Sequence, residues 1–73
     1  MNNELYIMLE TTCLAEIAKA KLSLSLLGKT PAGIGDHSTG DFYTSAREAL
    51  SKLAEYQDML NTLQAKYPQV VSL

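Results

Sequence analysis

A chain of 73 residues, of which 47% are hydrophobic, is long enough for one small domain, which we place at residues 1–73. Its net charge of −2, with six basic residues, provides no clustered basic surface and argues against a duplex nucleic acid as partner. The sequence shows neither a basic signal-peptide region at its start nor an apolar run of about 18 residues, so we expect a cytoplasmic protein that does not enter a membrane.

The segment from about residue 3 to residue 27 contains no Gly or Pro and predicts the first helix. Its clearest apolar positions recur at spacings of three and four and fall within an arc of roughly 80°. We call these positions the inner stripe: Tyr6, Leu9, Cys13, Ile17, Ala20, Leu24 and Leu27. An apolar stripe of this kind is expected to pack against another helix.

A second, weaker apolar band lies behind the inner stripe and is interrupted by Glu4, Thr11 and Ser25. We call it the outer band, and its members are Ile7, Met8, Leu14, Ala15, Ala18, Leu22 and Leu26. In a two-helix hairpin this band remains exposed in a monomer, and exposed apolar surface of that extent usually marks an interface. We therefore expect a homo-oligomer formed through the first helix. The alternative is that the interrupted band simply faces water.

The second helix is predicted to begin near Thr39, because Ser38 and Asp41 have the spacing of a capping box, and to end at about residue 66, shortly before Pro68. Its apolar stripe runs through Phe42, Ala46, Ala49, Leu53, Tyr56, Leu60, Leu63 and Tyr67. Residues 68–73 form a short tail that either frays or docks on a neighbouring chain. The predicted fold class is all-α, an antiparallel two-helix hairpin that assembles into an oligomeric helical bundle.

The connection, residues 28–38, is longer than most helix-to-helix loops. Gly28 is expected to end the first helix as a left-handed cap. Further along, Gly33 and Gly35 flank Ile34, and their bare backbone amides suit an anion-binding concavity next to a helix N-terminus. Donors that match a phosphate group are Lys29, Thr30, His37, Ser38 and Thr39. The alternative is an ordered loop in which Ile34 closes the end of the hairpin.

Two tyrosines complete the candidate ligand site. Tyr6 and Tyr43 are expected near opposite ends of the hairpin, and in an antiparallel assembly Tyr6 of one subunit can approach the loop of another. Either ring can stack on a nucleotide base while the loop binds its phosphates. Packing of both rings at interfaces is the competing interpretation.

Enzymatic chemistry is not expected, and no catalytic residue, metal ligand or cofactor is predicted. The letters GKT at residues 28–30 do not form a P-loop, since Ser23 stands where that motif needs a glycine and Pro31 follows the Thr. Asp36 and His37 offer only two adjacent metal ligands. The lone Cys13 is interpreted as a small buried hydrophobic residue of an intracellular protein rather than as a nucleophile.

The loop GIGDHS between two amphipathic helices, with the second helix carrying REALSKLAEYQDMLNTL, resembles very small helical-hairpin proteins encoded by bacteriophages. A looser resemblance is to the phage sponge hairpins that oligomerise and sequester the cyclic nucleotide signals of bacterial immunity, although the chain lacks their arginine-bearing end of the second helix. That resemblance implies intersubunit pockets, here matched in kind by Tyr6, Lys29 and Thr30, in the cytoplasm of an infected bacterial host. The alternative function is a protein-interaction module that binds or inhibits a host protein, with the loop purely structural.

Overall fold

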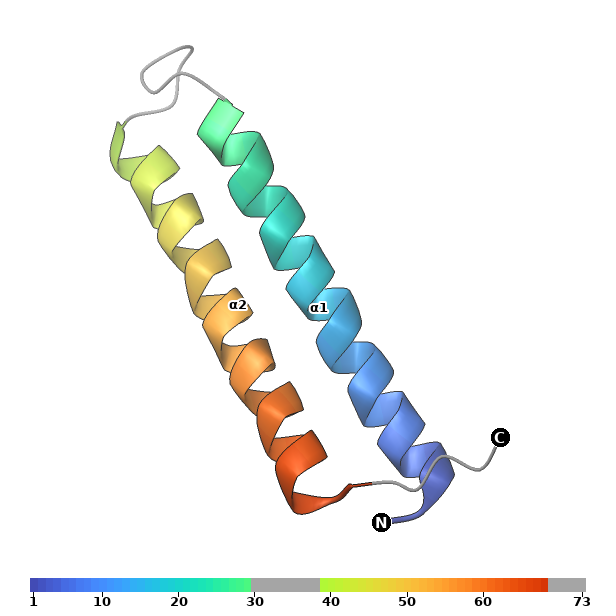
Figure 1. Ribbon diagram of the computed structural model, residues 1–73. Coiled ribbons are helices and arrows are strands. Elements are labelled where there is room, and N and C mark those ends of the chain that lie inside the picture. Colours follow the sequence, from blue (N-terminus) through green and yellow to red (C-terminus); the bar gives the residue numbers. More distant parts are fainter. Residues whose placement is uncertain (30–38, 69–73) are drawn as a thin grey trace.

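The computed structural model describes residues 1–29 and 39–68, and its two helices form an antiparallel hairpin (Figure 1). Helix α1 spans Asn3–Lys29 and helix α2 spans Thr39–Lys66. The described residues contain no strand. The predicted all-helical hairpin is therefore confirmed.

Asn2 caps the start of α1. Its side-chain Oδ1 accepts a hydrogen bond of 2.8 Å from the backbone N–H of Leu5, and its carbonyl accepts one of 3.1 Å from Tyr6. A side-chain acceptor at this position satisfies one of the N–H groups that the first helical turn leaves unpaired. Helix α2 begins at Thr39, where the sequence predicts, although Ser38 of the expected capping box lies outside the described residues.

The end of α1 differs from the expectation. The helix continues through Gly28 and ends at Lys29, so Gly28 is a helical residue and not a left-handed cap. Gly is common just after helices because it tolerates a positive φ, but nothing prevents it from adopting helical geometry. Lys29 occupies the last turn, where its positive charge complements the helix dipole.

The core lies between the two helices and is centred on Cys13, Ile17 and Leu60, with Leu53 and Tyr56 packed against them. All residues of the inner stripe are buried or half-buried. The predicted stripe of α2 is likewise turned inward up to Leu63, but Tyr67 is 48% exposed because it follows the last residue of the helix.

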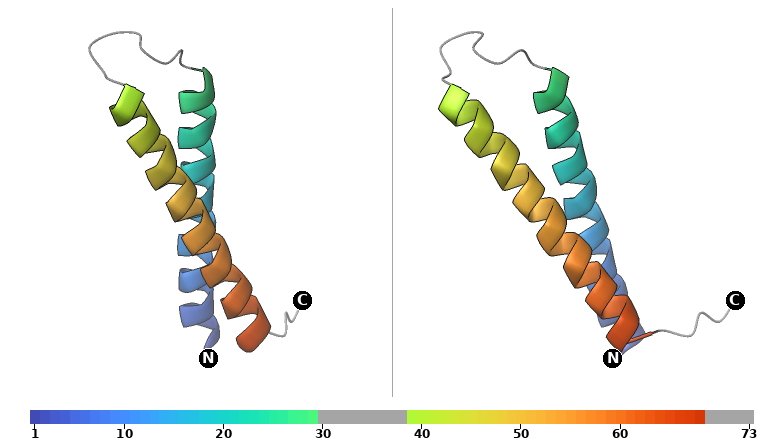
Figure 2. Two further views of the ribbon diagram at one scale, coloured as in Figure 1. Left: turned by 90° about the vertical axis from the view of Figure 1, so that its left-hand side faces the viewer. Right: turned by 60° about the vertical axis from the view of Figure 1, so that its left-hand side comes forward.

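Packing loosens toward the loop end of the hairpin. The stripe residues nearest that end, Leu24 and Leu27 of α1 and Phe42 and Ala46 of α2, are half-buried rather than buried. Both views of Figure 2 show the loop-side ends of the helices standing apart. The hairpin is thus closed by a compact core over its lower and middle parts and opens toward the loop.

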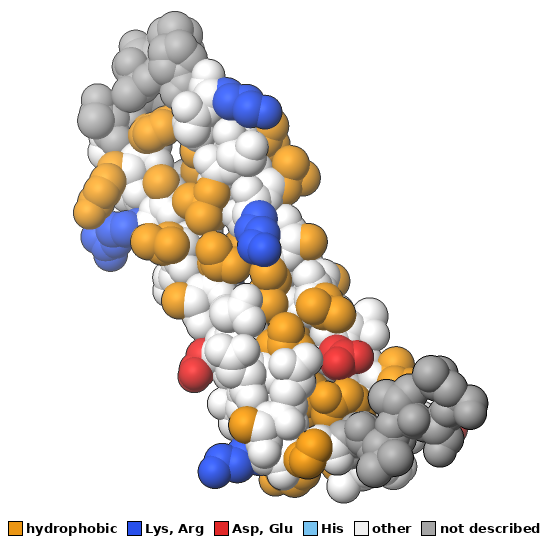
Figure 3. All heavy atoms as spheres, viewed as in Figure 1, with side chains coloured by type: hydrophobic (Ala, Val, Ile, Leu, Met, Phe, Trp, Pro, Cys, Tyr) orange, Lys and Arg blue, Asp and Glu red, His pale blue; other side chains and the backbone are white. Residues whose placement is uncertain are grey.

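The outer band of α1 is exposed, as expected for a single hairpin. Its five large side chains are between 50% and 60% exposed, and Ala15 and Ala18 are exposed as well. Figure 3 shows apolar side chains along the outer edge of α1 in addition to those in the groove between the helices. Because the molecule is one layer of two helices, α1 is covered on one side only.

Candidate functional site

Most of the sequence-predicted ligand site falls on the connection between the helices. Thr30, Gly33, Gly35, His37 and Ser38 lie outside the described residues, so the proposed cradle of backbone amides is not among the features that the structure describes. Thr39 is the first residue of α2. The structure places the remaining three predicted residues, Tyr6, Lys29 and Tyr43.

Tyr43 and Lys29 both lie at the loop end of the hairpin. Tyr43 is 61% exposed in the second turn of α2, and Lys29 is the exposed last residue of α1. The structure adds a residue that the sequence analysis missed, because the guanidinium carbon of Arg47 lies 5.8 Å from the centroid of the Tyr43 ring. The signal was present in the sequence, since residues four apart share one helix face. The loop end therefore combines an exposed aromatic ring with two cationic side chains.

Tyr6 lies at the other end of the hairpin. It is only 9% exposed, because its ring packs into the inner stripe near the start of α1. Within one chain it is therefore remote from Tyr43, as the sequence predicts for an antiparallel hairpin (Figure 1). Its burial gives it a packing role in the hairpin and leaves little of the ring available to a ligand.

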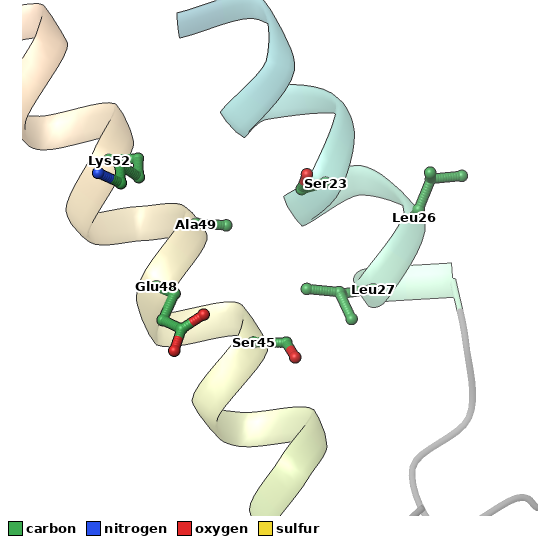
Figure 4. A pocket seen from close by; sticks show the side chains of 7 residues that line it. All are labelled: Ser23, Leu26, Leu27, Ser45, Glu48, Ala49 and Lys52. Carbon is green, nitrogen blue, oxygen red and sulfur yellow. The ribbon is translucent and has the colours of Figure 1, made fainter. Parts of the chain in front are cut away.

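A hollow of about 470 Å³ lies between the helices on the loop side. Figure 4 shows Leu27 and Ala49 pointing toward each other across it, whereas Leu26 points away from α2. The rest of its lining is Ser23 and Ser45 with Glu48 and Lys52, which places small and charged side chains around an apolar floor. The hollow lies where the two helices separate toward the loop.

A second hollow, of about 320 Å³, lies at the end of the hairpin where α1 begins. Its lining includes Leu9 and Cys13 of α1 and Met59 and Leu63 of α2, with Tyr67 at its rim, so it is mostly apolar. Cys13 itself is 3% exposed. The Cys13 thiol is therefore covered by neighbouring side chains and forms part of the core.

No cluster of three or more His, Cys, Asp or Glu side chains in residues 1–29 and 39–68 has an arrangement suited to a metal ion. Neither described helix has the length and apolar character needed to cross a membrane.

The outer band remains the most extensive uncovered feature among the residues described. It follows α1 from Ile7 to Leu26, nearly the whole length of the helix. Charged residues stand at both of its ends, with Glu4 before it and Lys29 after it. No residue of the band belongs to the hairpin core.

Comparison with protein-family models, with curated proteins and with solved structures finds no match for this chain.

Proposed function

We propose that this chain is a non-enzymatic binding protein that works as a homo-oligomer of helical hairpins, with the outer band of α1 as the interface between subunits. The observation that carries the proposal is the exposure of the whole band in a hairpin whose core forms without any residue of the band. Burial of a Leu or Ile side chain contributes about 1.5 to 3 kcal/mol, so covering the half-exposed side chains of two copies provides a large driving force for association.

Substitution within the band tests this proposal. Leu14→Asp and Leu22→Asp each place a charge on the interface, and sedimentation velocity should show both variants as monomers at concentrations where the unmodified chain is assembled. Leu50→Asp is the matched control, because Leu50 is an exposed leucine of α2 with a similar exposed fraction, 57%. Circular dichroism should show that all three variants remain helical.

The outcome that contradicts the proposal is a monomer for the unmodified chain over the whole accessible concentration range. In that case the band is available to a different protein, and the interaction module that binds or inhibits a host protein becomes the better hypothesis. A pull-down from host lysate with the unmodified chain and with Leu22→Asp then separates binding through the band from binding elsewhere.

A second candidate function is supported by the loop end of the hairpin. There the exposed ring of Tyr43 and the cations Arg47 and Lys29 offer stacking and charge to a small phosphorylated ligand, such as the cyclic nucleotide immune signal bound by a phage anti-defence sponge. In this function the oligomer sequesters the ligand in the cytoplasm of the infected bacterium and performs no chemistry on it.

Native mass spectrometry of the freshly purified protein, followed by titration with a panel of cyclic nucleotides, tests ligand capture. Retained ligand in whole-number copies per oligomer supports it, and Tyr43→Ala and Arg47→Ala should each remove that binding. Lys66→Ala is the matched control, since Lys66 is a cation at the opposite end of α2. If no nucleotide binds, or if the control loses binding as much as Arg47→Ala does, the loop-end site is wrong.

A further inference from the structure

The charges of α1 are divided between its two halves. Residues 3–16 contain three acidic side chains and no basic one, and residues 17–29 contain three basic side chains and no acidic one. The acidic residues are Glu4, Glu10 and Glu16, and the basic residues are Lys19, Lys21 and Lys29. None of the six forms an ion pair with another described residue. The separated charges of α1 therefore form no ion pairs within the described part of the hairpin.

The helix dipole accounts for only part of the pattern. A negative charge in the first turn and a positive charge in the last turn are stabilising, which covers Glu4 and Lys29. The effect fades beyond the terminal turns. Glu10 and Lys21 lie about two turns from the nearer end of α1, so the helix dipole does not account for them.

The positions of four of these charges around the helix show where a partner lies. At 100° per residue, Glu4 and Lys29 point within about 20° of each other, and both directions fall inside the arc of the outer band. By the same rule, Glu10 and Lys21 point within about 20° of each other, along one flank of the band. Glu16 is different, because it is half-buried and shares a small hollow with Lys52 of α2.

The outer face of α1 thus has a symmetric order along its length: acid, apolar residues, two alanines, apolar residues, base. The midpoint between Glu4 and Lys29 in the sequence falls between Ala15 and Ala18. A surface of this order matches itself after a half-turn that reverses the direction of the helix, which is the condition for the twofold interface of a dimer.

We propose that a second copy of this chain covers the outer band with its own α1 running in the opposite direction, and that the crossing point lies at Ala15 and Ala18. This inference rests on the self-assembly proposed above and specifies its geometry. It places Glu4 beside Lys29 of the partner subunit and Glu10 beside Lys21 of the partner subunit, and the twofold axis generates each pair twice.

A parallel arrangement of the two α1 helices lacks this match. It would set Glu4 against its own copy at one end and Lys29 against its own copy at the other, and like charges in contact are repulsive. In the antiparallel arrangement the alanines at the centre let the two backbones approach closely, while the larger apolar side chains on either side exclude water.

The antiparallel arrangement also has a consequence for the loop end. It brings the start of one α1 next to the end of the other, so that the Asn2–Tyr6 segment of each subunit lies near the last turn of its neighbour. The ligand site predicted from the sequence needed this juxtaposition across subunits, and a single hairpin does not provide it.

Disulfide trapping measures the orientation directly. Thr11 and Leu22 lie near the centre of the outer face, within about 20° of each other around α1, and are placed symmetrically about the crossing point. Thr11→Cys and Leu22→Cys are purified separately, mixed and oxidised, and the linked species are identified by intact mass. We expect the mixed Thr11→Cys/Leu22→Cys dimer to dominate, because a disulfide requires Cα atoms within about 7 Å and in this arrangement the two Thr11→Cys positions are about 16 Å apart.

Two results would overturn parts of this inference. Cross-linking of Thr11→Cys mainly with itself overturns the antiparallel orientation while leaving self-assembly intact. An unmodified chain that sediments as a monomer overturns self-assembly and, with it, this inference. The unmodified chain is also oxidised under the same conditions as the control for Cys13, which is 3% exposed and is expected not to cross-link.

Charge reversal tests the ion pairs separately. Two double variants reverse the charges, Glu4→Lys/Glu10→Lys and Lys21→Glu/Lys29→Glu. The dissociation constant of each variant's dimer should be at least about tenfold higher than that of the unmodified chain, and an equimolar mixture of the two variants should recover the unmodified value. The matched control is Glu48→Lys/Glu55→Lys on α2, which changes the net charge of −2 by the same amount, four positive charges, as the first variant does. If the control weakens the dimer equally, net charge rather than pairing across the interface is responsible, and the proposed pairs are wrong.

Discussion

The guanidinium carbon of Arg47 lies 5.8 Å from the centroid of the Tyr43 ring, one helical turn earlier on α2. A cation over an exposed aromatic face contributes about 0.5 to 1 kcal/mol. Arg47→Ala should therefore lower the free energy of unfolding by no more than about 1 kcal/mol, as measured by urea denaturation at fixed protein concentration. Arg47→Lys, which keeps the charge, should retain part of the effect. A loss above about 2 kcal/mol would show that Arg47 has a structural role beyond this ring.

Leu60 should be among the most sensitive positions of the chain. It is 7% exposed and packs in the core with Cys13 and Ile17. Leu60→Ala should lower the free energy of unfolding by about 2 to 5 kcal/mol, because the substitution leaves a cavity in addition to removing buried apolar surface. In a hairpin of this size that is enough to unfold a large fraction of the protein at room temperature.

The control for that experiment is Leu50→Ala on the same helix. Leu50 is 57% exposed, so Leu50→Ala should lower the free energy of unfolding by less than about 1 kcal/mol. Far-ultraviolet circular dichroism during urea denaturation measures both variants. Equal losses for the two leucines would contradict the assignment of the core.

Cys13 should be protected from thiol reagents in the folded protein. The side chain is 3% exposed in the centre of α1, so reaction with a chromogenic disulfide reagent has to await unfolding. We expect slow labelling in native buffer and rapid, stoichiometric labelling in denaturant. A Cys13→Ser/Leu22→Cys variant, whose thiol lies in the outer band, provides the exposed comparison and should react quickly at low protein concentration. Rapid native labelling of Cys13 in the unmodified chain would show that the core opens readily.

The hairpin could be predicted because its signal is local and repeated. Residues from Tyr6 to Leu27 recur with helical spacing, and each of these inner-stripe residues is turned toward α2. The same reasoning failed at Tyr67, which continues the stripe of α2 in the sequence but follows the end of the helix and is exposed. Periodicity predicts which face a residue occupies within a helix, and it contains no information on how far beyond the helix end that face stays covered.

The candidate site was predictable only in part. The position of Tyr43 at the loop end follows from its place near the start of α2. The spacing of four places Arg47 on the same helix face, but it does not specify that the guanidinium lies over the ring. The spacing placed Tyr6 in the inner stripe, whereas its residue type and its position at the start of the first helix placed it in the ligand site; the structure buries the ring, as the stripe predicts. The choice between a stacking and a packing role for a tyrosine depends on the neighbouring helix, which the local sequence does not specify.

Asn2 should contribute more to stability than its exposed position suggests. Its Oδ1 accepts the 2.8 Å hydrogen bond from the N–H of Leu5 at the start of α1. Replacement of such a cap by Ala costs about 1 kcal/mol, while Asn2→Asp should keep the acceptor and add a favourable interaction with the helix dipole. Urea denaturation should therefore rank the unmodified chain and Asn2→Asp above Asn2→Ala. If Asn2→Ala is as stable as the unmodified chain, this end of α1 is frayed in solution.

Gly28 offers a position where a substitution should stabilise the protein. It lies within α1, its φ is not in the left-handed region, and a Cβ atom built at this position meets nothing within 4 Å. Gly28→Ala should therefore raise the free energy of unfolding by about 0.5 to 1 kcal/mol, because Ala loses less backbone entropy in a helix. A left-handed cap at Gly28 would reverse the sign, since Ala is strained at positive φ. Urea denaturation of this single variant thus distinguishes a helix that continues to Lys29 from one that stops at Leu27, and a loss of stability would overturn the helical assignment of Gly28.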